Sequence, residues 1–374
     1  MKKIIKFVSI ILLITVLSAC NQTSQSSEVD SKDSVQQENE MNEKDTEKNN
    51  EKNQKSIDKE EETNPKDEID LTLKPNENGQ IMVLMYHGIG DEEKTWTRHH
   101  ENFKKDLEYL YSKGYRPISL EDFVNNNINT KAGYTPIVIT FDDGRQNNFN
   151  IIEKNDEKVI DSKSAVAILE NFNKEHPDFP LEATFFLNGK NPFGQPELVE
   201  YKLNYIIDKG MDIGNHTINH NNMAIDKNQD AEKIQKYIAK EVGFINSILP
   251  NYKVDTYALC NGGRPNDNLE KYLKKGQYEN IQYNNIAILN VGWKPSASPI
   301  DKDFNPLSIH RVRASEMNVD NVGMYDWLKY FENNPSKKYI SDGKPNIITI
   351  PEKEKDNIDK NKIEEKELYI YESN

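Results

Sequence analysis

Residues 136–144 contain the feature that most limits how this chain can fold. The apolar, β-branched run at 136–139 predicts a short buried strand. It leads into Asp142, Asp143 and Gly144. Two adjacent carboxylates at the end of a buried strand are unfavourable, because like charges resist joint ionisation and burial disfavours the charged form. A bound cation is the simplest relief, so we expect a cation near this turn.

Residues 216–220 offer partners for such a cation. They read His-Thr-Ile-Asn-His and follow a second strand-like segment at 211–214. Histidines four positions apart lie on one face of a helical turn, so His216 and His220 can reach a single ion. Two imidazoles and one carboxylate, with open positions left over, form the ligand set of a catalytic divalent site. The other carboxylate of the aspartate pair is then free to act as a base.

The charge balance excludes one class of partner. The formal net charge is -14, and the 374 residues contain no basic stripe that could replace the counterions of a nucleic acid. Uncharged sugars and amino-sugar polymers are compatible with such a surface. The length allows one large domain or two of ordinary size.

Residues 1–19 have the form of a targeting signal. Three lysines precede an apolar run at 7–17, which is too short to span a membrane as a permanent helix. Residues 17–20, Leu-Ser-Ala-Cys, resemble the lipobox of bacterial lipoproteins. The resemblance implies diacylation of Cys20 and a lipid anchor in the extracytoplasmic face of the cell membrane. An ordinary signal peptide with an incidental cysteine is the alternative. With Cys20 acylated, Cys260 is the only thiol left, so we expect no intramolecular disulfide.

The segment after the signal predicts a disordered linker at 20–80. It is rich in Asn, Gln, Ser, Lys, Glu and Asp, and no aromatic residue occurs between Phe7 and Tyr86. Such a segment cannot bury enough apolar surface to offset its ordering entropy. We expect a folded domain at 81–351 and a loose, charged tail at 352–374.

Strand-like and helix-like segments alternate along the folded domain. The patterns predict strands at 81–86, 183–187, 254–259, 286–291 and 346–350, and helices at 196–210, 229–249, 268–275 and 324–331. Alternation with reactive groups at strand ends is what a parallel (β/α) barrel produces, because its active site lies at the C-terminal mouth.

The two motifs at 140–144 and 216–220 resemble the first two motifs of the polysaccharide deacetylases, also called NodB-homology domains or carbohydrate esterase family 4. The strand at 183–187 stands between them, as in that family. The resemblance covers roughly 81–351. It implies an α/β fold, a distorted (β/α)7 barrel of the NodB type, preceded here by the disordered linker.

The same resemblance implies roles for the motif residues. Asp143, His216 and His220 would be the metal ligands, and Asp142 would be the general base. Zn²⁺ suits the nitrogen and oxygen ligands, with Co²⁺ and Ni²⁺ as alternatives.

The later motifs match less closely. The family's third motif has the form Arg-x-Pro-Tyr-Gly, and residues 259–262 read Leu-Cys-Asn-Gly, with Cys260 in place of proline. The resemblance implies that Asn261 supplies a backbone N–H for the oxyanion, and that Arg311 replaces the missing arginine that steadies the base. Trp293 would wall the acetyl pocket, as a tryptophan of the fourth motif does; plain core packing is the alternative.

The last motif of the family, a Leu-x-His strand end that carries the catalytic acid, is not found at 346–351. Residues 85–87, Met-Tyr-His, have a similar form but precede the first motif. This order resembles the circularly permuted branch typified by poly-N-acetylglucosamine deacetylases. In a closed barrel the first and last strands are neighbours, which makes such a permutation possible. The resemblance therefore implies that His87 is the general acid.

Together these features predict a hydrolase of amide bonds that removes N-acetyl groups from a glycan. The substrate would be peptidoglycan, poly-N-acetylglucosamine or a chitin-like polymer. Two alternatives remain open. One is an O-acetyl polysaccharide esterase with the same machinery, and the other is a lipoprotein that binds wall glycan through a catalytically impaired site.

Overall fold

The computed structural model describes residues 64–314 and 322–372, and its main sheet is parallel throughout. The strands follow the order β13-β10-β9-β8-β5-β1-β14, and β4 pairs with β5 beside this path. Their bounds are β1 (Met82–Tyr86), β4 (Tyr115–Pro117), β5 (Thr135–Phe141), β8 (Thr184–Leu187), β9 (Asp212–Asn215), β10 (Thr256–Ala258), β13 (Ala287–Leu289) and β14 (Val312–Arg313).

The two ends of the strand path meet at residues 309–313. Val312 pairs with Leu84 of β1, and Ile309, in the same segment, forms a parallel bridge with Leu289 of β13. The sheet therefore curls round as a distorted (β/α)7 barrel, which confirms the predicted fold class.

The barrel strands carry continuous apolar runs because both of their faces are covered. All residues of β1 and β5 are buried. Strands of parallel sheets read in this way, since helices pack on one face and the barrel interior lies on the other. The absence of alternation in 136–139 is thus explained by the position of β5 between β1 and β8.

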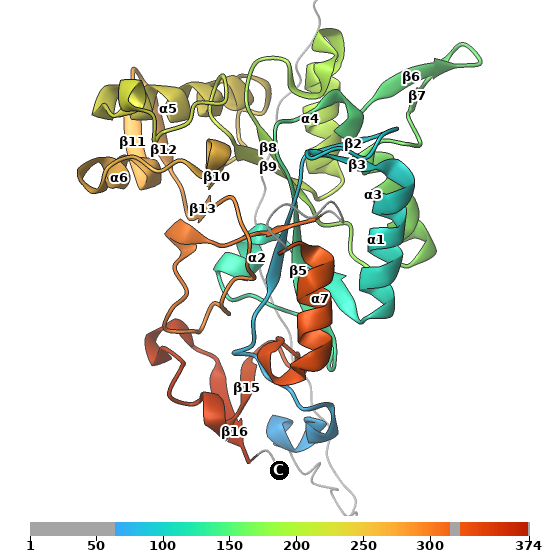
Figure 1. The fold of residues 1–374 in the computed structure, drawn as a ribbon, viewed down its shortest axis with the longest axis vertical. Coiled ribbons are helices and arrows are strands. Elements are labelled where there is room, and N and C mark those ends of the chain that lie inside the picture. The colour runs from blue at the N-terminus through green and yellow to red at the C-terminus, as the bar shows by residue number, and fades with distance from the viewer. Residues whose placement is uncertain (1–63, 315–321, 373–374) are drawn as a thin grey trace, which may run out of the picture. The chain divides into compact units, whose positions relative to one another are not determined.

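Helices surround the barrel and bury one apolar stripe each. Figure 1 shows α1 and α3 on one side of the strands and α5 and α6 on the other. Polar residues cap several helix starts; for example, Ser164 accepts from the Ala167 N–H and Asp230 from the Lys233 N–H. The helices are α1 (His100–Ser112), α2 (Leu120–Val124), α3 (Ala165–Glu175), α4 (Val199–Asp208), α5 (Ala231–Ile248), α6 (Asp267–Lys274) and α7 (Met324–Asn333).

Short two-stranded sheets extend from the barrel, and the sequence patterns do not predict them. Two are antiparallel hairpins, β6–β7 and β11–β12, and β2 and β3 form a small parallel pair (Figure 1). Their bounds are β2 (Gly88–Gly90), β3 (Thr97–His99), β6 (Ile151–Lys154), β7 (Glu157–Ile160), β11 (Lys275–Tyr278) and β12 (Ile281–Asn284).

Three predictions about the ends of the folded domain are wrong. The segment 346–350 is not a barrel strand: β15 (Ile347–Pro351) pairs only with β16 (Glu367–Tyr371) in a separate sheet, and β14 takes the last place in the barrel. The tail at 352–372 is ordered, because Ile358 and Ile363 pack against β15 in a small apolar cluster of their own. Residues 75–79 and Ile69 are buried as well, so packing begins before residue 81.

The predicted signal peptide at 1–19, the acylated Cys20 and the linker up to residue 63 lie outside the described residues. Within 64–314 and 322–372, no helix is both long and apolar enough to cross a membrane.

Glu77 makes the stability of this fold depend on pH. Its carboxylate accepts a hydrogen bond from the Thr349 N–H at 3.0 Å, but burial, and next the charge of Asp342, raise the pKa of Glu77 from 4.5 to about 8. Between these values the folded state keeps a proton that the unfolded chain loses. The contribution of Glu77 to the stability of the folded state is therefore fully present below about pH 4.5, and it is lost as the pH rises toward about 8.

We expect Glu77→Gln to reduce the fall in the free energy of unfolding as the pH rises, because the amide cannot ionise. Urea unfolding at about pH 5 and about pH 8 measures the effect as a difference in free energy of unfolding. Glu108→Gln, on the exposed face of α1, is the control and should leave the decline unchanged. An equal decline in wild type and Glu77→Gln would show that Glu77 does not cause it.

Candidate active site

The aspartate pair stands at the C-terminal end of β5, in a turn that needs unusual backbone angles. The Asp142 N–H donates to the Tyr86 carbonyl at 2.9 Å, which continues the pairing of β5 with β1 by one residue. Asp143 and Gly144 then have φ values of 76° and 54°. This left-handed turn sends the two side chains in different directions, so Asp142 is buried and Asp143 is partly exposed.

Asp142 forms a bidentate ion pair with Arg311. Both guanidinium–carboxylate distances are 2.7 Å, and the residues are 1% and 0% exposed. The guanidinium also donates to Thr140 Oγ1 at 3.2 Å and to the Asn290 carbonyl at 2.8 Å. Burial alone would raise the pKa of Asp142, but Arg311, followed by His216, outweighs it and holds that pKa below its usual range. Asp142 is therefore an ionised carboxylate at neutral pH.

The two histidines meet, although not on a helix as the spacing predicts. Residues 216–220 form a turn in which Thr217, Asn219 and His220 have positive φ values. The rings of His216 and His220 still lie 4.8 Å apart between centroids. His216 Nδ1 donates to the Ala258 carbonyl at 2.8 Å, which leaves its Nε2 lone pair free to bind a ligand.

The Nε2 atoms of both histidines face the same carboxylate oxygen. Oδ1 of Asp143 is 3.7 Å from His216 Nε2 and 3.5 Å from His220 Nε2. Ligands of one tetrahedral Zn²⁺ are separated by about 3.4 Å, as follows from metal–ligand distances near 2.1 Å. A carboxylate oxygen and two imidazole nitrogens at this separation fit a divalent cation. The chain therefore has residues that could hold the metal.

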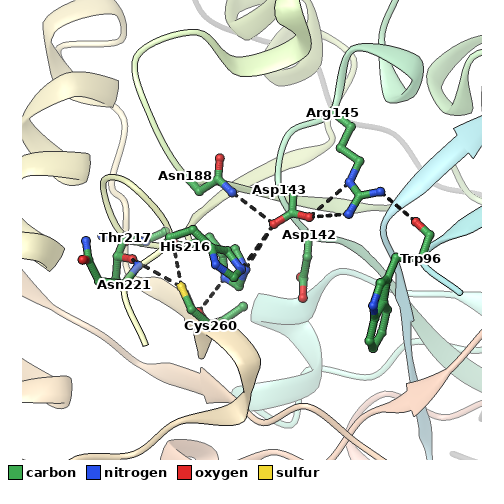
Figure 2. Close-up of polar contacts among 12 residues, drawn as sticks. Trp96, Asp142, Asp143, Arg145, Asn188, His216, Thr217, Asn221 and Cys260 are labelled. Carbon is green, nitrogen blue, oxygen red and sulfur yellow. Dashed lines mark hydrogen bonds and ion pairs between the residues drawn. The ribbon is translucent and has the colours of Figure 1, made fainter. Parts of the chain in front are cut away.

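Two residues that sequence reasoning did not identify hold the Asp143 carboxylate. Asn188, directly after β8, donates from Nδ2 to Oδ1 at 3.0 Å. Arg145 donates to Oδ2 from Nε at 3.1 Å and from Nη2 at 2.8 Å, and its Nη1 donates to the Trp96 carbonyl at 3.0 Å. Figure 2 shows Asp143 between these two side chains. Both residues follow predicted strands closely in the sequence, and this position is the signal that could have identified them as site residues.

We expect Arg145→Ala to weaken metal binding by about 10- to 100-fold, because partners that orient a ligand carboxylate have effects of this size. Repulsion between the guanidinium and the metal is screened by water, since the Arg145 side chain is 35% exposed. Competition with a fluorescent zinc chelator measures the affinity. Arg116→Ala removes an arginine–carboxylate pair of similar length, 2.7 Å to Asp178, and serves as the control. Unchanged or tighter binding in Arg145→Ala would contradict the orienting role.

Cys260 lies against the histidine motif on the side away from Asp143 (Figure 2). Its thiol donates to the His216 carbonyl at 3.1 Å and is 3.3 Å from Thr217 Oγ1. The sulfur and one nitrogen of each histidine all lie within 4.8 Å of one another. Burial raises the pKa of Cys260 to about 12, so this thiol is protonated at neutral pH and is held by its hydrogen bonds.

His87 follows β1 directly and lies under Trp96, with ring centroids 4.6 Å apart. Burial lowers the pKa of His87 to about 4, although Asp142 and Asp143 act in the opposite direction. The neutral imidazole is therefore the form present at neutral pH.

The structure gives the two remaining predicted residues different surroundings. Asn261 has a φ of 52° in the turn after β10, next to Cys260. Trp293 is 57% exposed, so it is not packed in the core. The Trp327 Nε1–H donates to the Trp293 carbonyl at 2.9 Å, and the Trp293 ring lies beside the ring of His310. The roles assigned to Asn261 and Trp293 stay predictions.

A curled parallel barrel with a buried carboxylate at the strand ends, beside three residues that could hold a cation, is an arrangement that suits a barrel hydrolase. Residues 129–281 match the family model described as polysaccharide deacetylase. The chain therefore contains a polysaccharide deacetylase domain.

Individual relatives are distant. The putative polysaccharide deacetylase YxkH of Bacillus subtilis is 23% identical over 254 residues, which are 67% of this chain and 77% of the relative. The deacetylase PplD of Streptococcus pyogenes is 18% identical, with 67% of this chain and 97% of PplD covered and a TM-score of 0.49. BC0361, a polysaccharide deacetylase from Bacillus cereus, is 18% identical, with coverages of 67% and 68% and a TM-score of 0.47.

Proposed function

We propose that this chain is a metal-dependent N-deacetylase that acts on an N-acetylglucosamine polymer of the cell wall or extracellular matrix. One observation carries the proposal. Oδ1 of Asp143 faces the Nε2 atoms of His216 and His220, while Asp142 is held apart by Arg311. A simple glycan binder has no need of an ionised carboxylate beside a cation site.

Each of the site residues then has its own role in the reaction. A divalent cation, for which Zn²⁺ fits the ligands and Co²⁺ and Ni²⁺ are alternatives, would lower the pKa of a water and polarise the acetyl carbonyl. Asp142 accepts the proton of the attacking water. A backbone N–H near Asn261 donates to the developing oxyanion. His87, whose resting ring is neutral, takes up a proton from solvent and delivers it to the departing nitrogen, which is a poor leaving group without it.

Acetate release tests the proposal directly. Purified, metal-loaded protein is incubated with acetylated peptidoglycan, poly-N-acetylglucosamine and chitin oligomers, with a chelator-treated sample as control. We expect acetate from one or more of these glycans and its loss on chelation. Glycan binding without acetate release at full metal occupancy would instead support a wall-glycan-binding protein with an impaired site.

O-deacetylation is the second candidate, and the lowered pKa of His87 favours it. The half-buried ring is neutral at neutral pH, because desolvation lowers its pKa to about 4. An ester oxygen needs less protonation to leave than an amine does. The same carboxylates and histidines would then hydrolyse acetyl esters on a polysaccharide.

His87→Ala separates the two reactions. We expect kcat for amide cleavage to fall by about 10²- to 10⁴-fold, the usual contribution of a general acid, and kcat for ester cleavage to fall much less. Acetate release from N-acetylated and O-acetylated glycans is measured in parallel, with His176→Ala as a control outside the site. Equal losses on both substrates would rule out His87 as the acid that protonates the leaving group.

Two further parts of the proposal concern location and ancestry. We propose that Cys20 is acylated and holds the domain at the extracytoplasmic face of the membrane, within reach of wall glycan. We also propose that the domain belongs to the circularly permuted branch. In support, β1, which carries His87 at its end, is the first barrel strand of the chain and lies between β5 and β14.

A further inference from the structure

A pocket of about 330 Å³ shares no residue with the candidate active site. It lies where the chain just before β1, at 76–80, meets the turn at 301–303, residues 336–337 and residues 354 and 357 of the tail. Main-chain pairing joins two of these segments, because Asp301 forms an antiparallel bridge with Ile358. A ligand in this pocket would therefore contact both ends of the folded domain at once.

Two buried asparagines in the wall of this pocket have side-chain oxygens without a donor. Asn76 and Asn78 are 3% and 6% exposed, and among the described residues no donor lies within hydrogen-bonding distance of either Oδ1 atom. Their amide nitrogens are bound to other lining residues: Asn76 Nδ2 donates to the Ser336 carbonyl at 3.0 Å, and Asn78 Nδ2 donates to Asp301 at 3.1 Å. Turning either amide over would place its oxygen against another acceptor, so both orientations are fixed. Buried acceptors in this state call for a partner from outside the chain.

The other groups of the pocket with spare capacity are carboxylate oxygens. Asp301, Asp303 and Glu354 all line it. Asp301 Oδ1 accepts from the Asp303 N–H at 2.8 Å, and Glu354 Oε2 accepts from Asn357 Nδ2 at 2.8 Å. Each carboxylate oxygen has a second lone pair, so these groups can accept more. A ligand that meets only acceptors is a cation.

Two lysines also line the pocket and oppose a cation. They are Lys302 and Lys337, and both are exposed. The Lys302 ammonium is already bound, since it donates to the Asp356 carbonyl. Water screens both lysine charges, and the three carboxylates outnumber them. The charge balance of the pocket therefore still favours a cation.

The chemistry of the oxygens indicates which cation it is. Within the described part of the chain, the lining contains neither an imidazole nor a thiol, which are the ligands that Zn²⁺ prefers. The three carboxylates also do not form a compact triad of their own among the described residues, so amide oxygens and water would have to complete the shell. Ca²⁺ accepts such a mixed and flexible set of about six to eight oxygens, whereas Mg²⁺ demands a nearly ideal octahedron.

We propose that this pocket is a Ca²⁺ site, formed by the amide oxygens of Asn76 and Asn78 and the carboxylates of Asp301, Asp303 and Glu354. The bound ion joins the segment before β1 to the tail after β15 and stabilises the packing between them. This site is separate from the residues of the proposed deacetylase, and its test does not depend on acetate release.

Calorimetric titration with Ca²⁺ tests the site in the full chain, with Zn²⁺ present to fill the cation site at Asp143. We expect saturable binding with a Kd of about 10⁻⁴ to 10⁻³ M, the range of extracellular calcium modules, and a higher urea midpoint in Ca²⁺. Asp301→Asn/Asp303→Asn should raise this Kd by about tenfold or more, because calcium affinity follows the number of charged ligands. Asp303 is exposed, so Asp303→Asn alone repeats the measurement if the double variant is unstable.

Asp156→Asn/Glu157→Gln is the matched control, because it removes the same charge from the exposed turn between β6 and β7. It should leave the Ca²⁺ Kd unchanged. Three results would each overturn the site: no saturable binding up to about 10 mM Ca²⁺, a Kd in Asp301→Asn/Asp303→Asn within about twofold of the wild type, or equally tight binding of Mg²⁺. The first of these would mean that water alone meets the two asparagine oxygens.

Discussion

Arg311→Ala is expected to lower the free energy of unfolding by about 3–5 kcal/mol. Arg311 and Asp142 are both almost wholly buried, and the guanidinium provides both of the carboxylate's close ionic contacts at 2.7 Å. Its removal leaves a negative charge in a low-dielectric interior without a partner. Breaking one side of a buried ion pair is therefore far more harmful than replacing both sides. Equilibrium unfolding in urea, followed by circular dichroism, measures the change.

Two comparisons make this prediction specific. Lys113→Ala breaks an exposed ion pair with Glu332 and should cost less than about 1 kcal/mol. The double variant Arg311→Met/Asp142→Asn removes both charges and should recover much of the loss. A change below about 1 kcal/mol in Arg311→Ala would mean that water or another cation replaces the guanidinium.

Asp142→Asn and Asp143→Asn are expected to abolish activity for different reasons. Asp142 is assigned as the base, so its amide variant should keep the metal and lower kcat by about 10²- to 10⁴-fold. Asp143 faces both histidines, so its amide variant should lose the metal together with the activity. Metal content by atomic absorption and acetate release from the preferred glycan measure the two properties separately.

The pair also controls for folding. Each substitution conserves shape. Asp142→Asn leaves the Arg311 charge buried without its carboxylate, although the new amide oxygen can still accept one Arg311 hydrogen bond, so the free energy of unfolding should fall in this variant. Circular dichroism checks that both variants are folded before their metal content and activity are compared. Loss of metal in Asp142→Asn, or full metal retention in Asp143→Asn, would reverse the roles of the two carboxylates.

The sequence by itself determined the parts of this protein that depend on short-range pattern. A buried run ending in Asp142 and Asp143 can be read from hydrophobicity and adjacency, because a strand of a parallel sheet is covered on both faces. The alternation of strands and helices likewise predicts a parallel barrel. The pairing of His216 with His220 was predicted for a local reason that proved wrong, since the segment is a turn and not a helix.

Only the tertiary structure decided which distant residues complete the site. Arg311, which only the family resemblance had suggested, meets Asp142 because the segment 309–313 joins both edges of the sheet. From local pattern alone, 346–350 was an equally strand-like competitor for that place. Asn188 reaches Asp143 because β8 lies next to β5. Contacts of this kind depend on strand order, which follows from the packing of the whole chain. The local sequence pattern around each residue therefore does not predict them.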